Sequence, residues 1–260
     1  MRKKRLRSER VTAKEVADTL GISAMTVSRA LNNHPYVDEE TRKKVEQVAK
    51  RLGYSPDHIA KSLATRKTHT IGVVLPEITH SFFPEAIRGI EEVTYQRGYH
   101  LVLTHSAEDA EREKDAIRTL ESKRVDGILI STAQTMEDYR IYNQLVKSGV
   151  QLVFFDRCVW GIGASCVSID DEESAKQITE HLIGHGYKRI AHLNGPQRVS
   201  IGKARLRGYR RAIEGNGLTY REEMVIESGF HEGGGYEAMN RLLDLSPTRR
   251  PRAVVAINDP

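Results

Sequence analysis

The side chains near the amino terminus that could do chemistry are short hydroxyl and amide groups and one guanidinium. They are Ser23, Thr26, Ser28, Arg29 and Asn32. Such groups donate hydrogen bonds to phosphate oxygens, and a guanidinium can also hold a guanine through O6 and N7, worth ~1 to 3 kcal/mol of base discrimination. The set is therefore suited to binding a nucleic acid. The same residue types also cap helices, so their chemistry depends on the elements that carry them.

Two short helices with a tight turn between them would carry these residues. Thr12 followed by Glu15 predicts a capping box, in which each side chain hydrogen-bonds the backbone N–H of the other residue. Gly21 supplies the turn because it takes a positive φ without steric cost, and Ser23 is a second N-cap. The spacing predicts a helix-turn-helix, whose second helix enters the major groove of DNA. A generic helical hairpin would give much of the same pattern.

A third helix is predicted to complete a small, basic N-terminal domain. It begins after Asp38, ends at Gly53 and turns four apolar residues inward: Val45, Val48, Ala49 and Leu52. Residues 1–67 hold 16 Lys and Arg against 8 Asp and Glu, whereas the rest of the chain holds 24 against 27. This asymmetry favours an anionic polymer as partner, although a basic face can also be mere solvated surface.

From Thr70 onward, strand-like apolar runs alternate with amphipathic helical stretches. The predicted strands are residues 71–75, 99–104, 127–131, 150–155, 166–169, 189–194, 224–228 and 253–257. The predicted helices include residues 84–97, 111–123, 174–186 and 205–216. This alternation predicts an α/β fold of doubly wound parallel sheets, with ligands at the carboxyl ends of the strands. We expect two such sheets, the second of which begins near Val167.

Other classes of function find no support in the sequence. It holds no GxSxG, P-loop or HExxH motif, and Gly233, Gly234 and Gly235 lack the first-strand context of a phosphate loop. We therefore expect no enzyme, no cofactor and no metal. Cys158 and Cys166 lack metal or CxxC spacing and are predicted to be reduced thiols. Without an apolar span or a signal peptide, we expect a cytoplasmic protein instead of a periplasmic solute-binding protein.

Five runs of the N-terminal segment carry a resemblance to a known family: residues 11–17, 21–23, 26–32, 37–41 and 52–54. They closely resemble the headpiece of the lactose/galactose (LacI/GalR) repressor family. The resemblance implies that Ala24, Met25 and Arg29 read base edges, and that Ala24 offers only an apolar contact. Thr12, Ser23, Thr26, Ser28 and Asn32 would position the protein on the DNA without reading sequence.

Residues 55–64 resemble the hinge helix of the same family. In that family two such helices pair in the dimer and insert a leucine into the minor groove, and Leu63 stands at that position beside Ala60 and Lys61. Wedging a base step costs roughly a few kcal/mol and returns a kinked duplex that contacts more protein. The segment is too short to be a stable helix alone, so we expect it to order only with DNA and a partner subunit.

The remaining chain resembles the same family in residues 70–76, 82–83, 88–91, 124–127, 185–190 and 205–209. This implies two lobes like those of periplasmic sugar-binding proteins, with an effector in the cleft between them. The implied effector-binding residues are Phe82, Phe83, Asp156, Arg205, Phe230, Asn258 and Asp259. Such a site suits a sugar-like or other polar molecule. Val199 and Ile201 stand where the purine-repressor branch of the family has polar contacts, which argues against a purine. His80 and Ser81 replace the more usual Asn-Pro before the aromatic pair.

The resemblance also implies the domain organisation and the mode of action. We expect a headpiece over residues 1–54, a hinge over residues 55–68, an N-terminal lobe over residues 69–166 and a C-terminal lobe over residues 167–260. Because relatives continue beyond Pro260, we expect a fragment with an incomplete second lobe. We expect a homodimer that binds a pseudo-palindromic operator, usually as a repressor, while an effector shifts the lobes and the hinge.

Overall fold

The computed structural model describes residues 11–55, 67–79 and 82–259. The chain divides into two compact units, residues 1–66 and residues 67–260. Within the described ranges, no helix is long and apolar enough to cross a membrane.

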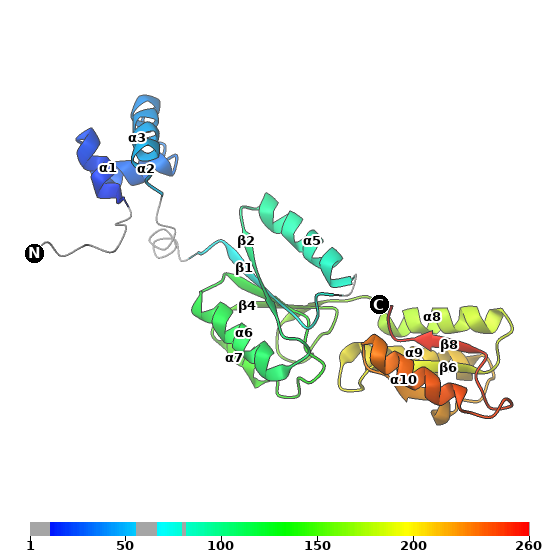
Figure 1. Ribbon diagram of the computed structural model, residues 1–260. Helices are drawn as coiled ribbons and strands as arrows, with labels where there is room; N and C mark the ends of the chain where they lie inside the picture. The colour runs from blue at the N-terminus through cyan, green and yellow to red at the C-terminus, as the bar shows by residue number, and fades with distance from the viewer. Residues whose placement is uncertain (1–10, 56–66, 80–81, 260) are drawn as a thin grey trace, which may run out of the picture. The chain divides into compact units, whose positions relative to one another are not determined.

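The described part of the first unit, residues 11–55, holds the three helices α1 (Ala13–Leu20), α2 (Ala24–Leu31) and α3 (Glu39–Leu52) (Figure 1). The predicted capping box at Thr12 and Glu15 is confirmed, and Gly21 ends α1 in the left-handed conformation, with φ 64°. Ser23 and Asp38 cap α2 and α3 by accepting hydrogen bonds from backbone N–H groups. The helices close around one buried cluster: Val16, Ala17, Val27, Ala30, Val37, Val45 and Ala49.

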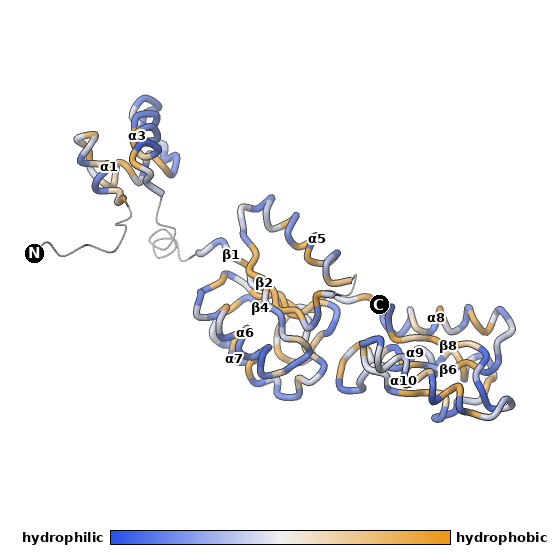
Figure 2. Tube along the Cα trace, in the orientation of Figure 1, coloured by the Kyte–Doolittle hydropathy of each residue, from blue (hydrophilic) through white to orange (hydrophobic). Residues whose placement is uncertain are grey.

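The second unit begins with a five-stranded parallel sheet in the order β2-β1-β3-β4-β5. Its strands are β1 (Thr70–Leu75), β2 (His100–His105), β3 (Gly127–Ile130), β4 (Gln151–Phe155) and β5 (Ser165–Val167). Helices α5 (Phe82–Gln96), α6 (Ala110–Ser122) and α7 (Arg140–Lys147) cover it. Residues alternate between the faces: Val74 packs with α6 and α7, whereas Val73 and Leu75 pack against Phe83 of α5. Figure 2 shows the resulting apolar strands between more hydrophilic helices.

A second parallel sheet of three strands follows, in the order β7-β6-β8. Its strands are β6 (Ile190–Asn194), β7 (Val225–Glu227), which follows a short 3-10 turn η1 (Glu222–Met224), and β8 (Ala253–Ala256). Helices α8 (Asp171–Gly184), α9 (Ser200–Gly215) and α10 (Glu232–Leu243) pack against it. Gly208 lets α9 lie directly on α8, because a Cβ there would stand 2.0 Å from the Glu172 carbonyl oxygen.

Two sequence predictions about this unit are wrong. The strand around Val167 does not open the second sheet, because β5 pairs with β4 and extends the first sheet; the second sheet begins at β6. Cys158 and Cys166 are not reduced thiols, since they form a disulfide with their Cα atoms 6.0 Å apart. The spacing of eight residues hid this pair, because only the β4–β5 pairing brings its two ends together. The predicted domain boundaries stay predictions.

Candidate nucleic-acid interface and ligand cleft

Helix α2 has one buried face and one exposed face. Val27 and Ala30 are completely buried in the headpiece core. Ala24, Met25, Ser28 and Arg29, together with the C-cap residue Asn32, are exposed and fall on the opposite face at helical spacing. The core therefore fixes which side chains α2 can offer to a partner. Arg29 forms no ion pair with any residue of the described part of the chain.

The Ser23, Thr26 and Asn32 side chains form hydrogen bonds at the two ends of α2. The Ser23 Oγ accepts from the Thr26 N–H at 3.1 Å and lies 2.9 Å from the Thr26 Oγ1. The Asn32 amide donates to the Ser28 carbonyl at 2.8 Å. These bonds leave the hydroxyls free to accept or donate one more, so capping and phosphate contact are compatible. The hinge candidates Ala60, Lys61 and Leu63 lie outside the described residues.

One exposed side chain near this surface was missed by the sequence reasoning. Tyr36, in the turn between α2 and α3, is 86% exposed and its ring lies 5.2 Å from that of His34. A large aromatic residue within a polar turn was the signal that could have identified it.

A cleft of about 890 Å³ opens in the second unit, and all seven predicted effector residues line it: Phe82, Phe83, Asp156, Arg205, Phe230, Asn258 and Asp259. They come from α5, from the end of β4, from α9, and from the loops after β7 and β8. Most of the remaining lining is apolar, with Ile90, Val167, Ile169 and Ile178 among it. The cleft thus combines hydrophobic walls with a few charged groups, as small-molecule sites do.

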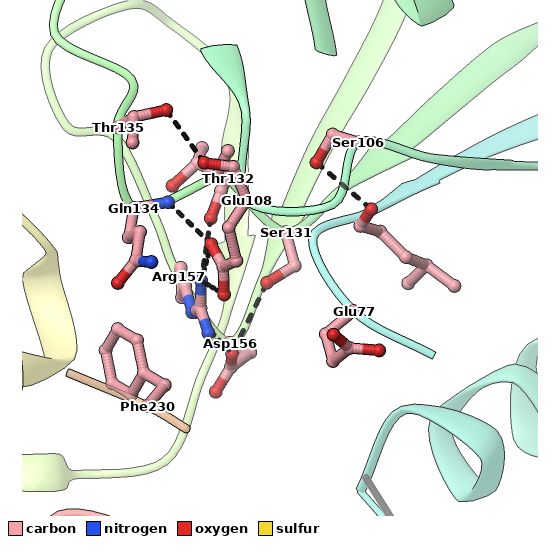
Figure 3. Close-up of polar contacts among 12 residues, drawn as sticks. Glu77, Ser106, Glu108, Ser131, Thr132, Gln134, Thr135, Asp156, Arg157 and Phe230 are labelled. Atoms are coloured by element: carbon pink, nitrogen blue, oxygen red, sulfur yellow. Dashed lines mark hydrogen bonds and ion pairs between the residues drawn. The ribbon is translucent and has the colours of Figure 1, made fainter. Parts of the chain in front are cut away.

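Asp156 and Arg157 occupy the wall of the cleft at the carboxyl end of β4 (Figure 3). Asp156 has a left-handed backbone, with φ 59°, which a side chain adopts only at a cost. Its carboxylate accepts a long hydrogen bond from the Ser131 hydroxyl at 3.3 Å. Burial raises the pKa of Asp156, although Arg157 and Arg205 oppose the shift. This carboxylate retains acceptor capacity toward the cleft.

Arg157 contacts residues that follow strands of both sheets, Glu108 after β2 and Phe230 after β7. Its guanidinium donates to both Glu108 carboxylate oxygens at 2.8 Å, and its Cζ lies 4.1 Å from the centre of the Phe230 ring. Glu108 in turn accepts from the Gln134 N–H at 2.7 Å, as Figure 3 shows. The Arg157 Nε is buried without a hydrogen-bond partner and lies 3.7 Å from the Asp156 carboxylate. Sequence reasoning identified Asp156 but missed its neighbour.

Arg205 faces the cleft from α9 and is paired. Its guanidinium donates to the Asp171 carboxylate at 2.8 Å and to the Ile257 carbonyl. The partner Asp171 lies in the first turn of α8, where a carboxylate is favoured by the helix dipole, and was missed as a site residue. His192 also lines the cleft, and burial lowers its pKa. Val199 and Ile201 are buried against Phe230 and Ile257.

Two family profiles match this chain. The profile described as "Bacterial regulatory proteins, lacI family" matches residues 12–57. The profile described as "Periplasmic binding proteins and sugar binding domain of LacI family" matches residues 68–260, which is more than half of the chain. The chain belongs to the LacI family. It is therefore a DNA-binding transcription regulator of the repressor type with an effector-binding domain, and not an enzyme.

Individual relatives of this LacI-family protein are similar along most of its length. It is 33% identical to the catabolite control protein A of Priestia megaterium, over 96% of this chain and 74% of the relative. It is 35% identical to the ribose operon repressor of Escherichia coli strain K12, over 95% of this chain and 74% of the relative.

Solved structures agree on the architecture. A complex of the transcriptional regulator CelR with cellobiose is 31% identical, with a TM-score of 0.64, and the match covers 95% of this chain and 74% of that one. The lac repressor dimer bound to operator and an anti-inducer is 24% identical, with a TM-score of 0.82 over 96% of this chain and 74% of that one, which shows a shared fold.

Proposed function

We propose that this LacI-family regulator reads operator DNA with the exposed face of α2. The observation that supports this proposal is that α2 has two different faces. Val27 and Ala30 are buried in the core on one face, and Met25 and Arg29 are exposed on the other. A helix held in this way can place its N-terminal side chains at base edges in the major groove. Because Arg29 has no ion pair within the described residues, its guanidinium is available to hold a guanine.

The test is selection of bound duplexes from a random pool at physiological salt, followed by comparison of two arginine variants. Arg29→Ala should lose ~5- to 150-fold in affinity for the selected operator, and should lose its preference at one base pair of each half-site. Arg51→Ala is the matched control, because Arg51 is an exposed arginine in the last turn of α3. Equal weakening of Arg29→Ala on every sequence would show a phosphate contact instead of base reading.

We also propose that the protein acts in the cytoplasm as a homodimer on a pseudo-palindromic operator. One headpiece covers about half of a site, and pairing of two headpieces requires two-fold symmetry. The lac repressor, which shares this fold, has been solved as a dimer on its operator. Light scattering on the full chain should give twice the 29.3 kDa of one protomer. A monomer at concentrations that saturate the operator would contradict the dimer.

The cleft in turn supports control by a polar small molecule of the sugar class. Asp156 can accept hydrogen bonds from hydroxyl groups, Arg205 is pre-oriented by Asp171, and Phe82 and Phe83 offer apolar faces beside them. The hinge candidates Ala60, Lys61 and Leu63 would carry the effect of the ligand to the headpiece. An effector that changes operator affinity must have its own affinity changed by the operator by the same factor.

Titration calorimetry with ribose and cellobiose tests the cleft, because the similar proteins include a ribose operon repressor and a CelR–cellobiose complex. Asp156→Asn should weaken any saturable binding by about tenfold or more, because a hydrogen bond to a charged group contributes about 1.5 to 3 kcal/mol. Asp115→Asn is the control, since Asp115 is exposed and pairs with Arg118 on α6. Unchanged affinity in Asp156→Asn would place the ligand elsewhere.

A further inference from the structure

Tertiary structure brings the two cysteines of the chain together at one point. Cys158 follows β4, Cys166 lies in β5, and the strand register sets Phe154 opposite Cys166. The bond between them closes a loop over residues 159–165. Gly161 and Gly163 turn this loop with φ of 84° and 72°, conformations that glycine adopts without strain.

The disulfide adjoins residues of the ligand cleft along the chain, and a hydrogen bond joins it to α9. Arg157, the residue before Cys158, and Val167, the residue after Cys166, both line the cleft. The Cys158 backbone N–H donates to the Ser200 Oγ at 3.1 Å, in the first turn of the helix that carries Arg205. A change at the sulfur atoms therefore reaches the cleft wall along the chain and reaches α9 through one hydrogen bond.

The two cysteines differ in exposure. Cys158 is only 7% exposed, whereas Cys166 is half-buried between the exposed residues Ser165 and Val167. An incoming thiol or disulfide would therefore meet Cys166 first. Both cysteines also pack into the apolar cluster that holds Phe154 and Tyr142. Reduced cysteines pack as small hydrophobic residues, so the surrounding fold can persist without the bond.

We propose that Cys158 and Cys166 form a reversible redox modification site that takes low-molecular-weight thiols and disulfides as reactants. In the oxidising direction the Cys166 thiolate attacks one sulfur of glutathione disulfide, forms a mixed disulfide and expels one glutathione thiolate. The Cys158 thiolate then attacks the Cys166 sulfur and expels the second. The two cysteine thiols lose two protons and two electrons, and the glutathione disulfide takes them up as two molecules of reduced glutathione.

The consequence for ligand binding rests on the proposed function of the cleft. With the bond closed, the loop holds Arg157 and Val167 at a fixed separation across the β4–β5 edge, and with it open this constraint is lost. The oxidised form is thus the one with a pre-organised cleft wall, and pre-organisation lowers the ordering cost of binding.

Thiol counting on the full chain tests the chemistry. Maleimide labelling and mass spectrometry should find two reactive thiols after treatment with reduced glutathione and none after excess glutathione disulfide. Two thiols that persist in glutathione disulfide, or a stable mixed disulfide, would overturn the proposal. Cys166→Ser should instead leave Cys158 without a partner and give no intramolecular bond.

Hydrogen exchange tests the link to the cleft. Reduction should speed exchange at least about tenfold in residues 156–169 and leave residues 190–194 in β6 unchanged. Ser200→Ala should remove any change that reduction causes in the first turn of α9. Identical exchange in both forms would overturn the coupling. Operator binding, measured separately on the oxidised and the reduced protein, distinguishes the two proposals. Operator binding by a protein whose thiols do not exchange would refute only the redox site. Thiol exchange by a protein that does not bind an operator would refute only the proposed function.

Discussion

Glu113, a buried carboxyl group on α6, should make the folded protein less stable as the pH rises from 5 to 8. Its side chain is completely buried, accepts a hydrogen bond from the Tyr142 hydroxyl, and accepts another from the Ala133 N–H at 2.6 Å. Burial raises the pKa of Glu113 from 4.5 to about 7, against the opposing effect of these bonds. The folded protein therefore holds a proton on Glu113 that the unfolded chain releases at lower pH.

The sign and the size of the effect follow from that difference. The pKa of Glu113 is higher in the folded protein than in the unfolded chain. Its contribution to the free energy of unfolding is therefore fully present below pH 4.5 and is lost as the pH rises through about 7. Integrating proton binding between pH 5 and pH 8 gives a loss of about 2.5 kcal/mol. Glu113→Gln removes this titration; its carbonyl oxygen can accept from the Ala133 N–H while its amide N–H donates to the Tyr142 hydroxyl oxygen. The variant should therefore gain about 2.5 kcal/mol on the natural protein between these pH values.

Denaturant unfolding at pH 5 and pH 8 measures this difference. Far-ultraviolet circular dichroism is the suitable probe, because Trp160, the single tryptophan, is already 71% exposed in the folded protein and its emission would change little on unfolding. Burial lowers the pKa of His192 and gives a trend of opposite sign, but this contribution is common to both proteins and cancels. Glu111→Gln is the matched control, because it removes an exposed carboxylate from the same helix, where Glu111 pairs with Lys114. The same free-energy difference between Glu113→Gln and the natural protein at both pH values would refute the reasoning.

Three further predictions concern stability and each is checked by denaturant or thermal unfolding. Gly208→Ala should cost about 1 to 3 kcal/mol or more, because its Cβ would meet backbone atoms of α8, whereas Gly215→Ala, which meets nothing within 4 Å on the same helix, should be neutral or stabilising. Tyr142→Phe should cost about 1 to 3 kcal/mol by leaving Glu113 without its donor, and a cost near zero would show that this bond contributes nothing. The double variant Cys158→Ser and Cys166→Ser should lose about 2.6 kcal/mol, the value for closing a nine-residue loop, and reducing agent should then leave its stability unchanged.

Local chemistry explains why much of the headpiece was predictable. The capping box at Thr12, the left-handed turn at Gly21 and the N-cap at Ser23 depend on residues at most three positions apart. The strands of both sheets also begin and end within two residues of the predicted ranges, because buried parallel strands read as continuous apolar runs. Helix α10 was harder to predict, because its first turns hold three glycines, which disfavour a helix. Gly234 is required there by packing, since a Cβ would lie 1.9 Å from the Ser228 carbonyl oxygen.

The sequence by itself determined the helix-turn-helix and the repeated parallel-sheet pattern, and its resemblance to the LacI family implied the seven residues that line the cleft. Tertiary structure alone decided which distant groups meet: Cys158 with Cys166 across β4 and β5, Arg205 with Asp171 across α9 and α8, and Glu113 with Tyr142 across α6 and α7. The physical reason is range. Caps, turns and apolar periodicity act between neighbours along the chain, whereas a disulfide, an ion pair or the burial of a carboxyl group depends on how separate elements pack.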